Sequence, residues 1–266
     1  MNGPGAAVNG PPVPVPELAA RLDEAAASAT PVDRLTATVS LDLTTAYRVQ
    51  RELVDRRVRR GERIVGLKLG LTSRAKMAQM GVDQMVWGWL TDAMRVPDGG
   101  SVDCGRLIHP RVEPEVAFLL TGRTGEFPDA VSAVAPALEV IDSRYTGFRF
   151  TLPDVIADNT SAAGFVVGPW RPVPSGVDNL GVLLEVDGRA VRVGSTAAIL
   201  ADPRRAVEQA LALAAAEGVA PQPGWVLLAG AATEAVPLTP GCRVRAVVEE
   251  LGGASLTARG GEVTAP

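Results

Sequence analysis

A succession of short apolar runs separated by turns limits what this chain can fold into. The runs that predict strands cover residues 64–69, 112–120, 137–141, 165–167, 182–186, 225–229 and 243–251. The 28 glycines and 21 prolines, in 266 residues, supply the many turns that such a series of strands requires. Strand runs with few helices between them favour an α+β fold over a doubly wound parallel sheet.

Helical patterns are strongest near the N-terminus. Residues 17–29 and 41–60 have apolar positions at helical spacing, and Ser40 is expected to cap the second of these helices. Helices are also predicted between the strands, at residues 72–80, 152–157 and 203–217. The last of these has Asp202 as its expected N-cap and Pro203 at its first position.

The chain divides into four segments on these patterns. We expect a flexible tail at residues 1–16, an N-terminal helical region with the first strand at 17–95, a β-rich metal-binding core at 96–252 and a C-terminal tail at 253–266. The first segment consists mainly of small residues and proline with no periodicity, which is typical of a tail.

Charge and composition exclude several classes of function. The 26 Lys and Arg residues against 30 Asp and Glu residues give a net charge of −4, so no basic nucleic-acid footprint is expected. No apolar run is long enough to span a membrane, and residues 1–16 lack the pattern of a signal peptide, so a cytoplasmic protein is expected. Two cysteines, Cys104 and Cys242, and the single His109 exclude a disulfide framework and a multi-histidine metal site.

Two glutamates in one apolar run are the strongest chemical signal. In the run Arg111–Leu120, alternate residues of a strand share a face, so Glu113 and Glu115 point the same way. Two carboxylates on one face repel each other and are costly to bury, and a hard divalent cation such as Mg²⁺, Mn²⁺ or Ca²⁺ relieves both problems. The alternative is an edge strand with a solvated acidic face.

A third carboxylate strengthens the metal hypothesis. Glu139 stands in a second short apolar run, where a glutamate usually has a partner. At the end of this run, Asp142 and Arg144 could form a structural ion pair or part of a clamp for a substrate carboxylate.

Lys68 is the next candidate. It shares a strand face with Gly66 and Gly70, which leave space for a ligand to approach the backbone. A lysine in this setting could be a charge partner or a proton donor, and the alternative is a surface lysine on an edge strand.

A polar cluster follows the helical stretch at 152–157. Residues 158–161, Asp-Asn-Thr-Ser, have the composition of a helix cap or a ligand-binding loop, and spacing does not decide between them. His109 is expected to be structural. Trp87 and Trp89 are expected in the core, with a pocket wall as the alternative.

The order of these motifs resembles the 2-oxopent-4-enoate hydratase and 4-oxalocrotonate decarboxylase family of the fumarylacetoacetate-hydrolase-like superfamily. The resemblance runs from about residue 30 to about residue 252. Its motifs are KLGLTS at 68–73, GVD at 81–83, LTD at 90–92, IHPRVEPE at 108–115, EVIDSR at 139–144, VIADNTS at 155–161 and VEELG at 248–252.

The resemblance implies a mixed, curled β-sheet core with flanking helices and a homo-oligomer. It also implies Mg²⁺ or Mn²⁺ held by Glu113, Glu115 and Glu139, the three carboxylates reached above. Positions matching the family's active site predict catalytic roles for three residues, Lys68, Asp92 and Ser161. Three further residues are predicted to contact the substrate, namely Leu71, Arg144 and Asn159.

Subtype residues are similar to those of the decarboxylase branch. Ile-His-Pro at 108–110, Leu-Thr-Asp at 90–92 and Phe-Arg-Phe-Thr-Leu at 148–152 are typical of that branch. Two departures point to an altered pocket: Glu234 stands where a small residue is usual, and Trp87 and Trp89 are bulkier than the family's residues at that turn.

The implied reaction is the metal-dependent decarboxylation of a 2-oxo-3-enedioate, such as 2-oxo-3-hexenedioate, to 2-hydroxypenta-2,4-dienoate through a metal-stabilised dienolate. One alternative is a hydratase acting on the 2-hydroxydienoate. Another is a non-catalytic subunit of such a hydratase. A complex with a sister hydratase is compatible with the decarboxylase function. Membrane and nucleic-acid partners are not expected.

Overall fold

The computed structural model of the chain describes residues 13–72 and 85–260. Its larger sheet has seven strands, six of them in the order β2-β1-β9-β4-β5-β6, with β10 paired to β4. These strands are β1 (Ile64–Gly70), β2 (Val86–Thr91), β4 (Arg111–Leu120), β5 (Val131–Ile141), β6 (Ala162–Val167), β9 (Val226–Ala231) and β10 (Val236–Pro237). The pairing of β1 with β9 is parallel and the other pairings are antiparallel, so the sheet is mixed.

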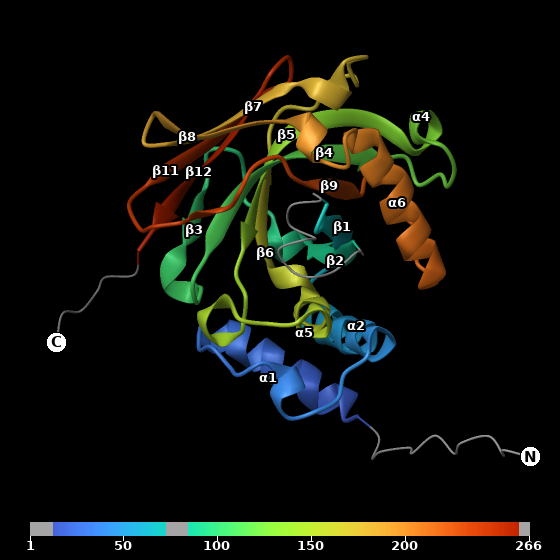
Figure 1. Ribbon diagram of the computed structural model, residues 1–266, viewed down its shortest axis with the longest axis vertical. Helices are drawn as coiled ribbons and strands as arrows, with labels where there is room; N and C mark the ends of the chain where they lie inside the picture. The colour runs from blue at the N-terminus through green and yellow to red at the C-terminus, as the bar shows by residue number, and fades with distance from the viewer. Residues whose placement is uncertain (1–12, 73–84, 261–266) are drawn as a thin grey trace, which may run out of the picture.

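A second sheet of five strands has the order β3-β12-β11-β7-β8. Its strands are β3 (Ser101–Asp103), β7 (Gly181–Val186), β8 (Arg189–Ser195), β11 (Arg243–Val248) and β12 (Gly252–Arg259). Leu184, Val244 and Leu256 of this sheet share one buried cluster with Val112 and Leu138 of the larger sheet. The two sheets therefore enclose a common apolar layer, which gives the curled core visible in Figure 1.

Helices cover the remaining surfaces of the larger sheet (Figure 1). They are α1 (Val15–Ser28), α2 (Leu43–Arg59), α4 (Phe127–Ala130), α5 (Leu152–Ala157) and α6 (Pro203–Ala216). Short 3-10 turns connect the strands, at η1 (Leu35–Ala37), η2 (Asp92–Met94), η3 (Cys104–Arg106), η4 (Thr146–Phe148), η5 (Asn159–Ser161), η6 (Val177–Asn179) and η7 (Thr196–Ala198). None of the helices in the described part of the chain is long and apolar enough to cross a membrane.

The predicted α+β class with a mixed, curled sheet is confirmed, and so is the cap of α6, where the Asp202 side chain accepts from Arg204 N. The cap expected for the second helix was wrong. Asp42, not Ser40, precedes α2, and its side chain accepts from Thr45 N, because the helix begins at Leu43 rather than Leu41. The helix predicted at 72–80 lies almost entirely outside the described residues.

The predicted C-terminal tail was wrong for residues up to 259. There the chain turns at Glu250, which has φ of +62°, and returns as β12 against β11. Only three small or medium side chains of β12, Ala254, Leu256 and Ala258, are buried, at alternating positions among glycine and polar residues. Because this alternation of apolar and polar residues is weak, the strand was not predicted from the sequence. Strands β1 and β2, which precede residue 95, belong to the same sheet as β4 and β5.

Candidate metal centre and its pocket

Strands β4 and β5 bring three carboxylates together. The antiparallel register places Glu113 directly opposite Glu139, and Glu115 follows two residues later on the same face of β4. Each of the three offers an oxygen within 4.8 Å of the others, and their exposed fractions are only 7%, 1% and 1%. The solvated acidic edge, which was the alternative reading of the sequence, is therefore wrong.

Burial and mutual repulsion make this cluster electrostatically costly. Burial, followed by the neighbouring charge of Glu139, raises the pKa of Glu115 well above its usual value. Burial also raises the pKa of Glu139 to about 6, although Lys68 acts in the opposite direction. Additional positive charge would therefore favour the ionised form of these carboxylates.

The donor set fits a hard divalent cation. Glu115 Oε1 and Glu139 Oε1 are buried and have no hydrogen-bond partner within the described residues, which is rare for buried carboxylate oxygens. Glu115 Oε2 accepts from Gly230 N at 2.8 Å, which fixes the carboxylate. Gly230 has φ of +108°, and a Cβ there would lie 2.1 Å from Thr72 Oγ1, so glycine is required. Three fixed carboxylates match the all-oxygen preference of Mg²⁺ and Mn²⁺.

Lys68 lies beside this cluster on β1 and is only 4% exposed. Its Nζ is 3.0 Å from Glu139 Oε2 and donates to Thr160 O at 3.2 Å. The surface-lysine alternative is therefore wrong. Because an ammonium group has three N–H donors, a third remains for a ligand.

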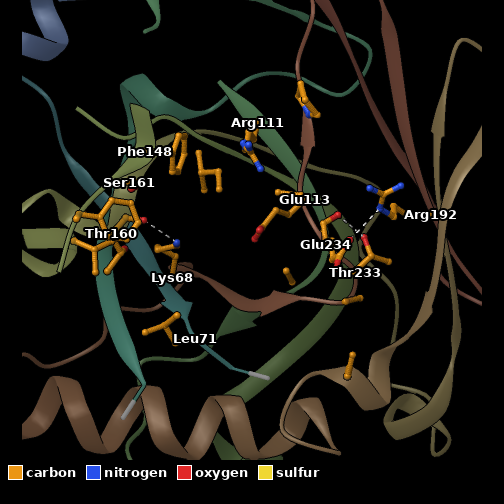
Figure 2. A pocket seen from close by; sticks show the side chains of 18 residues that line it. Lys68, Leu71, Arg111, Glu113, Phe148, Thr160, Ser161, Arg192, Thr233 and Glu234 are labelled. Carbon is orange, nitrogen blue, oxygen red and sulfur yellow. Dashed lines mark hydrogen bonds and ion pairs between the residues drawn. The ribbon is translucent and has the colours of Figure 1, made fainter. Parts of the chain in front are cut away.

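A cavity of about 700 Å³ opens onto the cluster (Figure 2). Four of the predicted site residues line it, namely Lys68, Leu71, Glu113 and Ser161. Its apolar wall consists of Ile141, Phe148, Phe150 and Val155.

The segment that carries Ser161 has an unusual backbone. Asn159, Thr160 and Ser161 are consecutive and have φ of +48°, +50° and +61°, a conformation that costs a non-glycine residue roughly 1–2 kcal/mol. The Asn159 amide fixes the segment by accepting from Trp89 N at 2.8 Å and donating to Trp89 O at 2.9 Å. As a result, Thr160 O faces Lys68, and Ser161 Oγ is buried without a partner among the described residues. Backbone strain of this kind clusters at functional sites.

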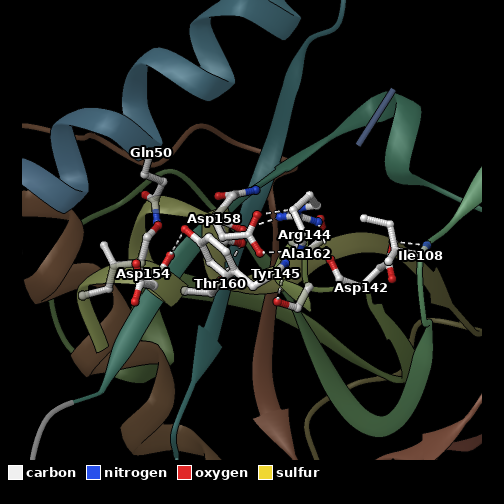
Figure 3. A network of polar contacts seen from close by, with 12 residues as sticks. Gln50, Ile108, Asp142, Arg144, Tyr145, Asp154, Asp158, Thr160 and Ala162 are labelled. Carbon is white, nitrogen blue, oxygen red and sulfur yellow. Dashed lines mark hydrogen bonds and ion pairs between the residues drawn. The ribbon is translucent and has the colours of Figure 1, made fainter. Parts of the chain in front are cut away.

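A buried ion pair supports the same segment from behind (Figure 3). Arg144 is 2% exposed and pairs with Asp158, which is fully buried. Its guanidinium also donates to Asp142 O at 2.6 Å and to Ala162 O at 3.2 Å. Asp142 itself accepts from Ile108 N and His109 N. The ion pair is structural, but its acid is Asp158 rather than Asp142.

Three residues predicted to be catalytic or to contact the substrate do not line the cavity. Arg144 was expected to contact the substrate but is occupied by Asp158, and the Asn159 amide is occupied by the Trp89 backbone. Asp92, which was expected to be catalytic, accepts from Arg63 N at 2.9 Å and from Arg63 Nε at 2.8 Å. Their partners are distant in sequence or come from unrelated motifs, so the sequence did not reveal them.

The sequence reasoning also missed residues of the cavity. Arg111, Phe148 and Arg192 line it. Arg111 could have been found, because it is two residues before Glu113 and therefore shares its strand face. Glu234 lines the cavity as the sequence suggested, whereas Trp87 and Trp89 line a separate cavity of about 190 Å³.

Comparisons with known proteins identify relatives of this chain. The chain is 50% identical over 252 residues to a 4-oxalocrotonate decarboxylase of Pseudomonas sp, covering 92% of this chain and 98% of that protein. It is 35% identical to a 2-keto-4-pentenoate hydratase of Burkholderia vietnamiensis, covering 91% and 97% of the two chains. No model of a protein family matches the sequence.

Two solved structures with related folds are also similar to this chain. A 4-oxalocrotonate decarboxylase from Pseudomonas putida G7, complexed with magnesium and adipate, superposes with a TM-score of 0.87 at 37% identity, over 92% of this chain and 97% of that one. A fumarylpyruvate hydrolase from Pseudomonas aeruginosa, complexed with Mn²⁺ and pyruvate, shares the fold at a TM-score of 0.57 and 15% identity, over 73% and 89% of the two chains.

Proposed function

The chain belongs to the family of 4-oxalocrotonate decarboxylases and 2-keto-4-pentenoate hydratases, within the fumarylacetoacetate-hydrolase-like superfamily, and on that premise we propose that it decarboxylates 2-oxo-3-hexenedioate. The reaction releases CO₂ and gives 2-hydroxypenta-2,4-dienoate. The observation that carries this proposal is the buried cluster of Glu113, Glu115 and Glu139, whose member Glu113 lines one cavity together with Lys68.

The cofactor is Mg²⁺ or Mn²⁺, which we propose is held by the three glutamates. The related decarboxylase was solved with magnesium and the related hydrolase with Mn²⁺. When bound, the ion supplies Lewis-acid stabilisation for negative charge on the oxygens of a 2-oxo acid.

The chemistry of the substrate defines what the protein must do. The bond between C5 and the distal carboxylate breaks, and its electron pair moves through the C3–C4 double bond towards the 2-keto oxygen. The protein must therefore hold the 2-oxo acid end in place, counter the charge that develops there, and keep water from the distal end.

Lys68 and Ser161 are suited to the first two tasks. The Lys68 ammonium is oriented by Glu139 and Thr160 O, and its third N–H can donate to an oxygen of the 2-oxo acid. The partnerless Ser161 hydroxyl can donate to a second oxygen. Both groups are held before substrate arrives, so little reorganisation accompanies the reaction.

The apolar wall is suited to the third task. Ile141, Phe148, Phe150 and Val155 replace water around the carbon chain of a bound substrate. A carboxylate loses its charge when it leaves as CO₂, so a poorly hydrated surrounding favours the departure.

Assembly and location are further proposals. We infer a homo-oligomer, with a sister hydratase as an additional partner, because the product of the decarboxylase is the substrate class of its hydratase relatives. A cytoplasmic location stays a prediction from the sequence.

An assay of CO₂ release tests the proposal. The purified protein, with Mg²⁺, with Mn²⁺ or with chelator, receives 2-oxo-3-hexenedioate and, separately, 2-hydroxypenta-2,4-dienoate. We expect metal-dependent CO₂ release from the diacid. Consumption of the dienoate without CO₂ release from the diacid would instead identify a hydratase.

Matched variants test the metal ligands. Glu113→Gln should abolish most of the turnover and Mn²⁺ binding, whereas Glu234→Gln, the same change at an exposed position of the same cavity, should leave Mn²⁺ binding intact. Turnover and metal binding at wild-type levels in Glu113→Gln would refute the assignment of the ligands.

A further inference from the structure

Three cationic side chains among the described residues line the large cavity, and they differ in their partners. Lys68 pairs with Glu139 at 3.0 Å, and Arg192 lies 3.7 Å from Glu234 at the opposite side of Glu113 (Figure 2). Arg111 has no acidic partner of this kind in residues 13–72 and 85–260. Its guanidinium carbon instead lies 5.3 Å from the ring centroid of Phe148.

The position of Arg111 relates it to the metal centre. It begins β4 and lies on the same face as Glu113, two residues away, so its side chain enters the cavity beside the carboxylate cluster. In Figure 2 its end points towards the space between Phe148 and Glu113. The aromatic face orients the guanidinium without neutralising its charge.

The formal charges around the cavity indicate that Arg111 is available to bind an anionic group. Among the described residues, Lys68 pairs with Glu139, and Arg192 and Glu234 offset each other. Arg111 is then the one lining cation of the described cavity whose charge is not offset. A second anionic group on the substrate would meet this charge, and a planar guanidinium is suited to binding a carboxylate through two hydrogen bonds.

We propose that Arg111 binds the distal carboxylate of the substrate and thereby makes the site select diacids over monoacids. The inference rests on the proposed function and extends it, because the hydration substrate of the relatives lacks this second carboxylate. Recognition by Arg111 would thus distinguish decarboxylation of a diacid from hydration of a monoacid at the same kind of metal centre.

The effect belongs to binding rather than to the chemical step. The distal carboxylate gives up its negative charge as it leaves, so a contact with Arg111 weakens on the way to the transition state. Removing Arg111 should therefore raise KM for the diacid and leave kcat unchanged or slightly higher. A purely structural role would instead lower kcat and the affinity for every ligand.

Two unreactive analogues isolate the contact. 2-Oxoadipate and 2-oxohexanoate share the 2-oxo acid end and the chain length, and they differ only in the distal carboxylate. Calorimetric titration of the Mn²⁺-loaded protein should show tighter binding of 2-oxoadipate, with an advantage that shrinks as salt is added. Arg111→Gln should reduce affinity for 2-oxoadipate about 10- to 100-fold and leave that for 2-oxohexanoate unchanged.

Control variants sharpen the result. Arg192→Gln makes the same change at the other arginine of the cavity and should preserve the preference for the diacid. Arg111→Lys should restore part of it, because the charge returns without the planar geometry.

The outcomes separate this inference from the proposed function. If wild type prefers 2-oxoadipate and releases CO₂ from the diacid, but Arg111→Gln keeps the full preference, the role of Arg111 is refuted and the decarboxylase proposal stands. If wild type releases no CO₂ and binds both analogues equally, both are refuted.

Discussion

Replacing Arg144 by methionine tests the support behind the left-handed segment. The variant removes the partner of Asp158, which is fully buried, and also removes the donors to the carbonyls of Asp142 and Ala162. Breaking a buried ion pair from one side leaves an uncompensated charge, so Arg144→Met should lower the free energy of unfolding by about 3–5 kcal/mol at pH 7.5.

The loss should depend on pH with a definite sign. Burial already raises the pKa of Asp158 from 3.8 to about 6, while Arg144 acts to lower it. Without Arg144 the folded-state pKa rises further, so the folded protein holds this proton more tightly than the unfolded chain does. Its contribution to stability is then present below the unfolded pKa and is lost as the pH rises, and the penalty should be smaller at pH 5 than at pH 7.5.

Urea unfolding followed by circular dichroism measures these differences. Arg144→Met with Asp158→Asn should recover part of the loss, because the second change removes the buried charge. Arg192→Met, at an arginine whose side chain is 42% exposed, is the control and should change stability by no more than about 0.5 kcal/mol. A loss below about 1 kcal/mol in Arg144→Met at pH 7.5 would refute the reasoning.

Three further predictions concern the site. Glu115→Gln should weaken Mn²⁺ binding at least about tenfold by calorimetry, since the buried oxygen loses its charge; unchanged affinity would exclude Glu115 as a ligand. Glu139 has a folded-state pKa of about 6, raised from 4.5, so its protonation stabilises the metal-free protein below pH 4.5 and this contribution is lost as the pH rises through 6. Because Mn²⁺ binds the deprotonated carboxylate, it should raise Tm more at pH 7.5 than at pH 5. Equal shifts of Tm at the two pH values would contradict this. Gly88→Ala places a Cβ 2.4 Å from Thr160 Oγ1 and 2.9 Å from Asn159 O, so it should cost about 1–3 kcal/mol and lower kcat while Mn²⁺ affinity is kept; wild-type kcat would show that the segment tolerates displacement.

Local sequence patterns were sufficient to predict much of the fold. Strands such as β4 have strong alternation or continuous apolar runs, and α6 has a clear N-cap, so both were predicted within a few residues. Strands β2, β3, β8, β10 and β12 were missed. β2 is rich in residues that favour strands, but Trp87 and Trp89 were interpreted only as core or pocket residues, whereas the small side chains of β12 give a weak alternation.

The sequence by itself determined which carboxylates could act together, because the twofold period of a strand places Glu113 and Glu115 on one face whatever surrounds them. Only the tertiary structure decided that the register sets Glu139 opposite Glu113, that Lys68 lies within reach, and that Arg111 rather than Arg144 enters the cavity. The same holds for Asp92 and Asn159, whose side chains are occupied by Arg63 and by the Trp89 backbone. The physical reason is that spacing along the chain fixes the direction of a side chain within its own strand, whereas its partner depends on which distant segments the fold packs against it.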